Sequence, residues 1–253
     1  MVSFVVVRMI FFVANLKGGS GKSSIAVSLS VALCRLPTSL RVLLVDLNAE
    51  QGSSFDWLGG RMEHQPKRLL ICERYSHQRD WVPDQVTQLT CIRFHGQRGI
   101  AELAPNFDHV VIDVLPQLSH LVFDMAALAD LTVLPTSPSI MDARPTVEIA
   151  KSFKKCGFDY RLLLNRVSTA GRTPTAEFEF AQNYLATFER NTLEGWIPMR
   201  PAYARALARG KALQECSYGD LSIYAGMVMR EIIEAASPWA IKGAPRKTRA
   251  AGK

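Results

Sequence analysis

A short segment near the start of the chain has the residue types that bind phosphate groups. Residues 17–24 read Lys-Gly-Gly-Ser-Gly-Lys-Ser-Ser. The three glycines leave backbone N–H groups accessible to an anion because they carry no side chains. The Lys22 side chain can reach the outer phosphates of a nucleotide, and the Ser23 hydroxyl can ligate Mg²⁺. The segment therefore predicts a site for a nucleoside triphosphate with magnesium.

Apolar patterns on both sides of this segment predict the elements that hold it. Residues 10–14 form an apolar run that is typical of a buried strand. After Lys22, apolar residues recur at helical spacing, at positions 25, 29, 33 and 36. A helix that begins near Lys22 directs the positive end of its dipole toward the loop. A strand, a loop and a helix are therefore expected in this order, with bound phosphates at the helix N-terminus.

Two more predicted strands end in a carboxylate. Residues 41–46 and residues 108–113 are mostly apolar runs that finish at Asp46 and Asp113. In doubly wound sheets, ligands bind at the carboxyl ends of the strands, so both acids are expected at the same edge as the glycine-rich loop. There they could hold Mg²⁺ or polarise the water that attacks a phosphate. For Asp46, a role in capping a turn stays open as the alternative.

The segments around these residues resemble the motifs of the ParA/MinD family of ATPases. An ordinary phosphate loop has a glycine where Leu16 stands, whereas Lys17 supplies the extra lysine of the deviant Walker A signature. The segment after Asp46 resembles the family's Asp-x-Asp-Pro-Gln motif, with Asn48 in place of the second aspartate. Residues 135–142 resemble a Pro-x-x-Pro-Ser-Pro-x-Asp segment of small plasmid partition ATPases in this family.

The resemblance covers about residues 9–233 and implies an α/β fold. The expected architecture is a doubly wound, mostly parallel sheet with helices on both faces, as in P-loop NTPases of the deviant Walker A type. The alternation of predicted strands and helices along the chain points to the same arrangement, because right-handed crossovers place helices on both sides of a parallel sheet.

The resemblance also implies residue roles. Catalytic roles fall on Lys17, Lys22, Asp46, Asn48 and Asp113. The residues expected to bind ATP are Lys17, Gly18, Gly19, Ser20, Gly21, Lys22, Ser23, Ser24, Asn165, Arg166 and Pro198. The expected Mg²⁺ ligands are Ser23, Asp46 and Asp113. Within these sets, Lys17 is expected to reach the ATP of a second copy, Asn165 to contact adenine, and Pro198 to lie in a loop against the base.

The family's reaction cycle implies a function. Two copies close around two ATP molecules, bind duplex DNA non-specifically, and release it after hydrolysis that a ParB-like or other small adaptor protein stimulates. The favoured cargo is a plasmid, which the protein would segregate. A protein assembly or a DNA-transfer complex stays open as an alternative cargo. Two rivals also stay open. One is a nucleotide-gated DNA-binding scaffold with negligible hydrolysis, which Asn48 favours. The other is a metabolic phosphate-loop ligase or kinase.

A basic segment follows the predicted nucleotide-binding residues. No acidic residue occurs between residues 197 and 214, whereas four basic residues do: Arg200, Arg205, Arg209 and Lys211. Arg205 and Arg209 are four residues apart, so a helix would place them on one face. The segment is interpreted either as a DNA-binding surface or as a solvated helix face.

The composition and the distribution of charge indicate how the chain divides into domains and in which compartment we expect the protein. The chain has 253 residues and a formal net charge of +7, and residues 238–253 contain five of its basic residues and no acid. We expect residues 1–8 to be an N-terminal extension, residues 9–237 the ATPase domain, and residues 238–253 a disordered basic tail. The five cysteines form no Cys-x-x-Cys pair. No run is long enough to span a membrane. These features favour a cytoplasmic protein without a membrane partner, associated with the nucleoid when ATP is bound.

Overall fold

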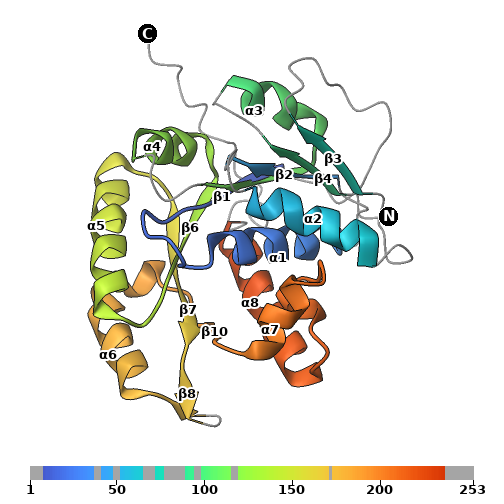
Figure 1. Ribbon diagram of the computed structural model, residues 1–253. Helices are drawn as coiled ribbons and strands as arrows, with labels where there is room; N and C mark the ends of the chain where they lie inside the picture. Colours follow the sequence, from blue (N-terminus) through green and yellow to red (C-terminus); the bar gives the residue numbers. More distant parts are fainter. Residues whose placement is uncertain are drawn as a thin grey trace, which may run out of the picture.

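The fold is centred on a parallel sheet of eight strands (Figure 1). The computed structural model describes residues 8–36, 41–47, 52–64, 72–76, 89–93, 98–114, 119–170 and 173–236. The strands of the sheet are β1 (Met9–Val13), β2 (Val42–Asp46), β3 (Cys72–Ser76), β4 (Leu89–Arg93), β5 (His109–Asp113), β6 (Leu131–Thr136), β7 (Tyr160–Val167) and β10 (Ile197–Pro198). Their order across the sheet is β10-β7-β6-β1-β5-β2-β4-β3.

The strand order makes the sheet doubly wound, as the sequence predicts. The chain begins at β1 in the middle, builds β2, β3 and β4 toward one edge, and returns to place β5 beside β1. It then builds β6, β7 and β10 toward the other edge. Each neighbouring pair of strands in this sheet is parallel. The direction of winding reverses beside β1, and such switch points are where doubly wound sheets bind ligands.

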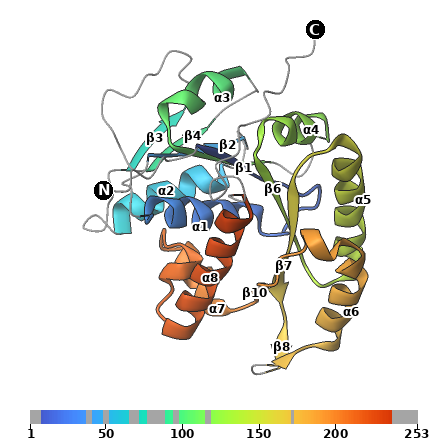
Figure 2. The ribbon, with the colours of Figure 1, turned by 180° about the vertical axis from the view of Figure 1, so that it is seen from behind.

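Helices cover both faces of the sheet and build two hydrophobic cores. One core contains residues of α1 (Lys22–Cys34), α2 (Ser53–His64), α7 (Pro201–Leu207) and α8 (Gly219–Ala236). The other contains residues of α3 (Arg98–Leu103), α4 (Ser119–Leu128), α5 (Ile140–Cys156) and α6 (Ala176–Leu185). Strand β1 contributes Phe11 to the first core and Phe12 to the second, because successive side chains of a strand face opposite sides. Figures 1 and 2 show the two helix layers with β6 and β7 between them.

The remaining elements are short. Strands β8 (Thr169–Ala170) and β9 (Thr173–Pro174) form an antiparallel pair. Within the described ranges, 3-10 turns cover Ala104–Asn106, Ala186–Asn191 and Leu213–Glu215. In the part of the chain that the structure describes, no helix combines the length and apolar character that crossing a membrane requires. The predicted extension and tail fall almost entirely on residues 1–7 and 237–253, which lie outside the described residues, so the domain boundaries stay predictions.

The predicted elements around the site are confirmed, with small shifts. The first predicted strand and helix are β1 and α1, and the two acid-terminated strands are β2 and β5, each starting one residue later than predicted. Helix α2 was not predicted, because two adjacent glycines, Gly59 and Gly60, interrupt a segment whose apolar residues recur at helical spacing. This helix contributes directly to the site.

Candidate nucleotide-binding site

Strand pairing brings the glycine-rich loop and the two acids to one edge of the sheet. Val13, the last residue of β1, pairs with Asp113 at the end of β5. Asp113 also pairs with Asp46 at the end of β2. Parallel strands in register end at the same level, so residues 14–21 start beside two carboxylates. The structure thus places Asp46 and Asp113 together, as predicted.

The loop between β1 and α1 has the backbone conformation that its glycines allow. Gly19 and Gly21 have φ angles of 76° and 88°, in the left-handed region that favours glycine. A Cβ atom on Gly21 would lie 2.1 Å from Nδ2 of Asn165, so a side chain would not fit. The loop is anchored by Asn15, whose Nδ2 donates to the Pro135 carbonyl at 2.8 Å and whose Oδ1 accepts from the Lys17 N–H at 3.0 Å. Sequence reasoning missed Asn15, although a polar residue directly after a buried strand was a signal.

Lys22 lies inside the curve of this loop. It is 7% exposed, and its Nζ donates to the Lys17 carbonyl at 3.0 Å. Burial lowers the pKa of Lys22, and the nearby charge of Asp113 opposes that shift. A cation that is removed from water and only partly compensated is suited to binding an anion.

The carboxylate of Asp46 caps helix α2. Asp46 is fully buried, and its Oδ2 accepts from the backbone N–H groups of Ser54 at 2.9 Å and Phe55 at 3.0 Å. These N–H groups belong to the first turn of α2, where a helix lacks internal acceptors. The structure therefore shows Asp46 in a capping role beside Asp113, and its predicted role toward Mg²⁺ or the attacking water stays a prediction.

Asp113 lies beside Asp46 with one oxygen engaged and one not. Its Oδ2 accepts from the Ser54 hydroxyl at 2.6 Å. Its Oδ1 is buried and has no hydrogen-bond partner among the described residues. Burial and then the charge of Asp46 raise the pKa of Asp113 to about 6, against the effects of Ser23, Ser54 and Lys22. A perturbed carboxylate with an unengaged oxygen is typical of a functional site.

The donor set fits Mg²⁺ when a nucleotide supplies further ligands. The unengaged oxygen of Asp113 and the neighbouring Ser23 hydroxyl are hard oxygen donors, which Mg²⁺ prefers. No cluster of three His, Cys, Asp or Glu side chains that could hold a metal occurs in the described part of the chain. Mg²⁺ commonly binds through one or two carboxylates together with substrate phosphates rather than in an all-protein cage. The site therefore suits a metal that arrives with phosphates.

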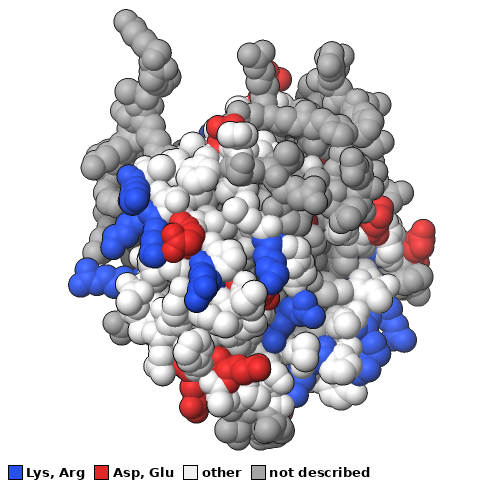
Figure 3. Space-filling view, turned by 60° about the vertical axis from the view of Figure 1, so that its left-hand side comes forward, with Lys and Arg blue, Asp and Glu red and all other residues white. Residues whose placement is uncertain are grey.

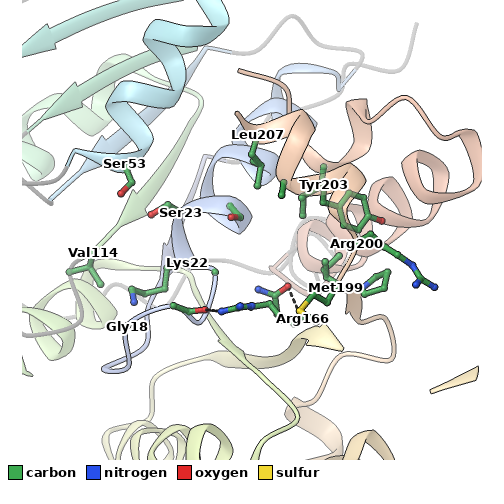
Figure 4. Close-up of a pocket in the computed structure, with 18 residues that line it drawn as sticks. Gly18, Lys22, Ser23, Ser53, Val114, Arg166, Met199, Arg200, Tyr203 and Leu207 are labelled. Carbon is green, nitrogen blue, oxygen red and sulfur yellow. Dashed lines mark hydrogen bonds between the residues drawn. The ribbon is translucent and has the colours of Figure 1, made fainter. Parts of the chain in front are cut away.

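A pocket of about 580 Å³ extends from the loop to α7 (Figure 4). Pockets of this size hold small ligands such as cofactors. Of the predicted ATP-binding residues, nine line it: Gly18, Gly19, Gly21, Lys22, Ser23, Ser24, Asn165, Arg166 and Pro198. Lys17 and Ser20 do not. Apart from Pro198, the far wall was not among the predicted ATP-binding residues, and it is mostly apolar, with one charged side chain: Ile197, Met199, Arg200, Tyr203, Ala204, Leu207 and Leu213. Lys22 and the far wall at Tyr203 lie on opposite sides of the pocket, which suits a ligand with a charged end and an apolar end.

Asn165 and Arg166 bond to the phosphate loop itself. Nδ2 of Asn165 donates to the Ser20 carbonyl at 2.8 Å, and Nη1 of Arg166 donates to the Gly19 carbonyl at 2.8 Å. Arg166 has a φ angle of 59°, rare for a residue with a side chain, and its N–H donates to Oδ1 of Asn165 at 2.9 Å. Two adjacent loop carbonyls are thus held by the end of β7. Contact of Asn165 with adenine stays a prediction.

Lys17 is paired within its own chain. Its Nζ forms an ion pair with Oδ1 of Asp142, in the first turn of α5. Burial opposes ionisation of Asp142, but hydrogen bonds from Lys17 and Ser137 give it a pKa below its usual value. The predicted contact of Lys17 with the ATP of a second copy requires this ion pair to open. Asn48, the remaining predicted catalytic residue, lies outside the described residues.

The basic segment is arranged differently from the prediction. Helix α7 ends at Leu207, so Arg209 lies in the turn beyond the helix, and the expectation that one helix carries both Arg205 and Arg209 was wrong. The reason is Gly210, which has a φ angle of 64° and ends the helix as glycines commonly do. Arg205 and Arg209 are exposed, whereas Lys211 is partly buried and Arg200 lines the pocket. The four basic residues thus occupy different environments.

Comparisons with known proteins show which family and fold the chain is similar to. A family model described as ATPase MipZ matches residues 8–151. An uncharacterized protein of Pseudomonas putida is 30% identical over 148 residues, which cover 50% of this chain and only 55% of the relative, so the chain spans about half the length of this relative. The chromosome-partitioning ATPase Soj of Thermus thermophilus is 29% identical over 219 residues, covering 80% of this chain and 86% of Soj. Among solved structures, the septum site-determining protein MinD of Pyrococcus horikoshii in complex with Mg-ADP has a TM-score of 0.63 at 19% identity, covering 95% of this chain and all of that chain.

Proposed function

Because the chain belongs to the MipZ family of ParA/MinD-type ATPases, we propose that it binds ATP with Mg²⁺ and hydrolyses ATP slowly to position a cargo in the cell. The observation that carries this proposal is the site itself. A buried lysine lies in a glycine-rich loop beside a carboxylate with an unengaged oxygen, and a pocket with an apolar far wall extends from them. A solved relative of the same fold is described with Mg-ADP.

Each part of the site has a role in this proposal. The loop N–H groups and Lys22 bind and orient the phosphates, and the end of β7 keeps the loop in place through Asn165 and Arg166. Ser23 and Asp113 would hold Mg²⁺, which supplies charge stabilisation to the phosphoryl oxygens when bound. Asp46 fixes the first turn of α2 beside them. The apolar wall from Ile197 to Leu213 receives the base.

The nucleotide site is tested by a pair of lysine variants. Lys22→Ala removes a charge-assisted contact to phosphate, so ATP affinity should fall by at least about tenfold. Lys17→Ala should leave ATP binding by the monomer nearly unchanged, because Lys17 does not line the pocket. It should instead prevent dimerisation with a non-hydrolysable ATP analogue, measured by light scattering after size exclusion. Equal loss of ATP binding in both variants would contradict this division of roles.

We further propose that the ATP-bound dimer binds duplex DNA through Arg205 and Arg209, the exposed basic side chains of this segment outside the pocket. Figure 3 shows one face of the molecule, on which the Lys and Arg side chains of the described residues are spread with acidic side chains among them. Each phosphate contact lowers the logarithm of the binding constant by about 0.9 for every tenfold rise in salt concentration. DNA binding should therefore weaken strongly as salt rises and show little sequence preference.

The DNA proposal is tested by the salt slope. Replacing Arg205 and Arg209 by Ala should reduce the magnitude of the slope by about 1.8 for each protomer of the dimer that contacts the DNA, two contacts at about 0.9 each. Lys154 and Lys155 are exposed in the last turn of α5 and provide a matched double variant that should leave the slope unchanged. An unchanged slope in the Arg205 and Arg209 variant would identify the segment as a solvated surface.

The cargo is proposed to be a plasmid, with a ParB-like adaptor that stimulates hydrolysis, and the ATP-bound protein would then lie in the cytoplasm on the nucleoid. The similarity to the chromosome-partitioning ATPase Soj supports a partition role. The rival of a nucleotide-gated scaffold predicts ATP binding without turnover. Single-turnover hydrolysis, measured with and without DNA, separates the two. A ligase or kinase would instead show DNA-independent turnover with a small-molecule acceptor.

A further inference from the structure

Ser54 contacts both acids of the site, although it belongs to none of the recognised motifs. It lies in the first turn of α2 and is completely buried. Its hydroxyl donates to Oδ2 of Asp113 at 2.6 Å, and its backbone N–H donates to Oδ2 of Asp46 at 2.9 Å. One residue thus links two carboxylates that come from different strands.

These two carboxylates need such a link because they are buried side by side. Asp46 and Asp113 pair across neighbouring strands, and the charge of Asp46 disfavours ionisation of Asp113. Donors that approach buried carboxylates reduce the free-energy cost of their charge. The Ser54 hydroxyl also engages one defined oxygen of Asp113. The other oxygen, Oδ1, is thereby left without a hydrogen bond among the residues that the structure describes.

The hydroxyl of Ser54 is separable from the capping of α2. The cap uses backbone N–H groups of Ser54 and Phe55, which any residue except proline would supply at these positions. The hydroxyl instead makes a short hydrogen bond to an ionisable carboxyl, the strong class of hydrogen bond when the acceptor is charged. Removal of the hydroxyl alone would therefore leave the cap in place and free the carboxyl of Asp113 to rotate.

We propose that Ser54 is a positioning residue for the magnesium site. Its hydroxyl holds the carboxylate of Asp113 in the orientation that keeps Oδ1 available to the metal or to a water bound to it. The inference rests on the proposed function, because it concerns magnesium that is bound together with ATP. It assigns to Ser54 a role toward the metal without direct ligation.

The test measures how much Mg²⁺ is needed for binding of a non-hydrolysable ATP analogue. In Ser54→Ala, the Mg²⁺ concentration for half-maximal binding should rise by about tenfold or more, as for other outer-shell partners of metal sites. The affinity for ADP in EDTA should change by less than about twofold, because without magnesium the variant loses at most one weak contact. Ser54→Thr retains the hydroxyl and should restore most of the wild-type Mg²⁺ dependence.

The matched control is Ser30→Ala. Ser30 is also completely buried, and its hydroxyl donates to the Ala26 carbonyl at 2.9 Å within α1, away from both acids. Thermal unfolding in EDTA shows how much stability each variant loses. A purely structural role for Ser54 predicts a lower unfolding temperature with a Mg²⁺ dependence no more shifted than in Ser30→Ala, and this result would overturn the proposal.

The outcomes also separate this inference from the proposed function. If the wild-type protein shows Mg²⁺-dependent nucleotide binding and Ser54→Ala shows the same dependence, only the role of Ser54 is wrong. If the wild-type protein shows no Mg²⁺-dependent binding, the proposed function is wrong and the role of Ser54 is overturned with it. A folded Ser54→Thr with the full defect of Ser54→Ala would also overturn the proposal, since the hydroxyl would then be present without effect.

Discussion

Two clusters of buried charge lie at opposite ends of helix α2, and they differ in how completely their hydrogen bonds are satisfied. At the start of the helix, Asp46 and Asp113 lie side by side next to Lys22, and one oxygen of Asp113 has no partner among the described residues. Further along the helix, Arg61 forms a two-pronged ion pair with Glu215. The first cluster is incomplete and the second is nearly complete.

The second cluster joins three separate segments of the chain. Oε2 of Glu215 accepts from Nη1 of Arg61 at 2.6 Å and from the Ala212 N–H at 2.9 Å, and Oε1 accepts from Arg61 at 3.1 Å and from Arg35 at the end of α1. Arg61 also donates to the Gly210 carbonyl at 3.1 Å. Burial opposes ionisation of Glu215, but the hydrogen bonds from Arg61 hold its pKa below the usual value.

The difference indicates which cluster serves function. A buried charge with complete partners is compensated within the fold and leaves no capacity for a ligand. A buried charge with incomplete partners carries a free-energy cost that a ligand can relieve. The cluster at Asp113 therefore has the character of a binding site, whereas the cluster at Glu215 holds α1, α2 and the segment before α8 together.

The largest expected effect comes from breaking the complete cluster. Glu215→Ala leaves two guanidinium groups without their shared partner, and breaking a buried pair in this way costs about 3–5 kcal/mol. The free energy of unfolding from urea titration should fall by that amount. Lys151→Ala, which removes the exposed pair with Glu148, is the control and should leave it unchanged. A loss as small as in the control would mean that the cluster is not compensated as the geometry indicates.

Removing a charge from the incomplete cluster, the one at Asp113, should instead raise the free energy of unfolding. The pKa of Asp113 is raised from 3.8 to about 6, so the folded state retains a proton that the unfolded state releases between these values. Stability from this group is therefore present below about pH 4 and lost as pH rises through about 6. At pH 8 and in EDTA, Asp113→Asn should be more stable than the wild type by up to about 3 kcal/mol, since one pKa unit corresponds to about 1.4 kcal/mol.

The pH dependence of the difference identifies its cause. The stability gain of Asp113→Asn should be small at pH 4 and should grow between pH 4 and pH 6, measured by urea unfolding at each pH. Asp124→Asn changes an exposed acid of α4 and should give a flat difference over the same range. A lower stability of Asp113→Asn at pH 8 would show that its neighbours fully compensate the buried carboxylate.

The sequence predicts the incomplete cluster better than the complete one. Lys22, Asp46 and Asp113 each adjoin an apolar run or a glycine-rich segment, and parallel pairing then fixes where they meet. These are local patterns, and the sheet converts them into proximity. The Walker-type residues could therefore be located before the structure, and nine of the predicted ATP-binding residues line the pocket.

The complete cluster depends on pairs that are distant in the sequence. Arg61 and Glu215 are 154 residues apart, and no periodicity connects them. Helix α2, which carries Arg61 and Ser54, has the glycines of a loop and forms through its contacts with the sheet and α1. The end of α7 at Leu207 likewise depends on Gly210, which packs against the backbone of Arg61. Local sequence patterns contain none of these contacts.

A third kind of charge pair, partly exposed, is expected to have the smallest effect on stability. Lys17 and Asp142 have side-chain exposures of 44% and 22%, and solvent screens such a pair. Asp142→Asn should therefore lower the free energy of unfolding by less than about 1 kcal/mol at pH 7. The hydrogen bond from the Ser137 hydroxyl, at 2.6 Å, can persist because the asparagine amide retains an acceptor oxygen.

The same substitution should have a larger effect on association than on folding. If Lys17 must leave Asp142 before it reaches the ATP of a second copy, the ion pair opposes dimerisation. Asp142→Asn should then lower the protein concentration at which the ATP analogue produces dimers, because the neutral amide holds the ammonium group less strongly than the carboxylate does. Light scattering across a concentration series measures this shift, with Asp124→Asn as the control. Unchanged dimerisation in a folded, ATP-binding Asp142→Asn would show that the ion pair does not hold Lys17 back, and that this exposed pair is as neutral for assembly as it is for stability.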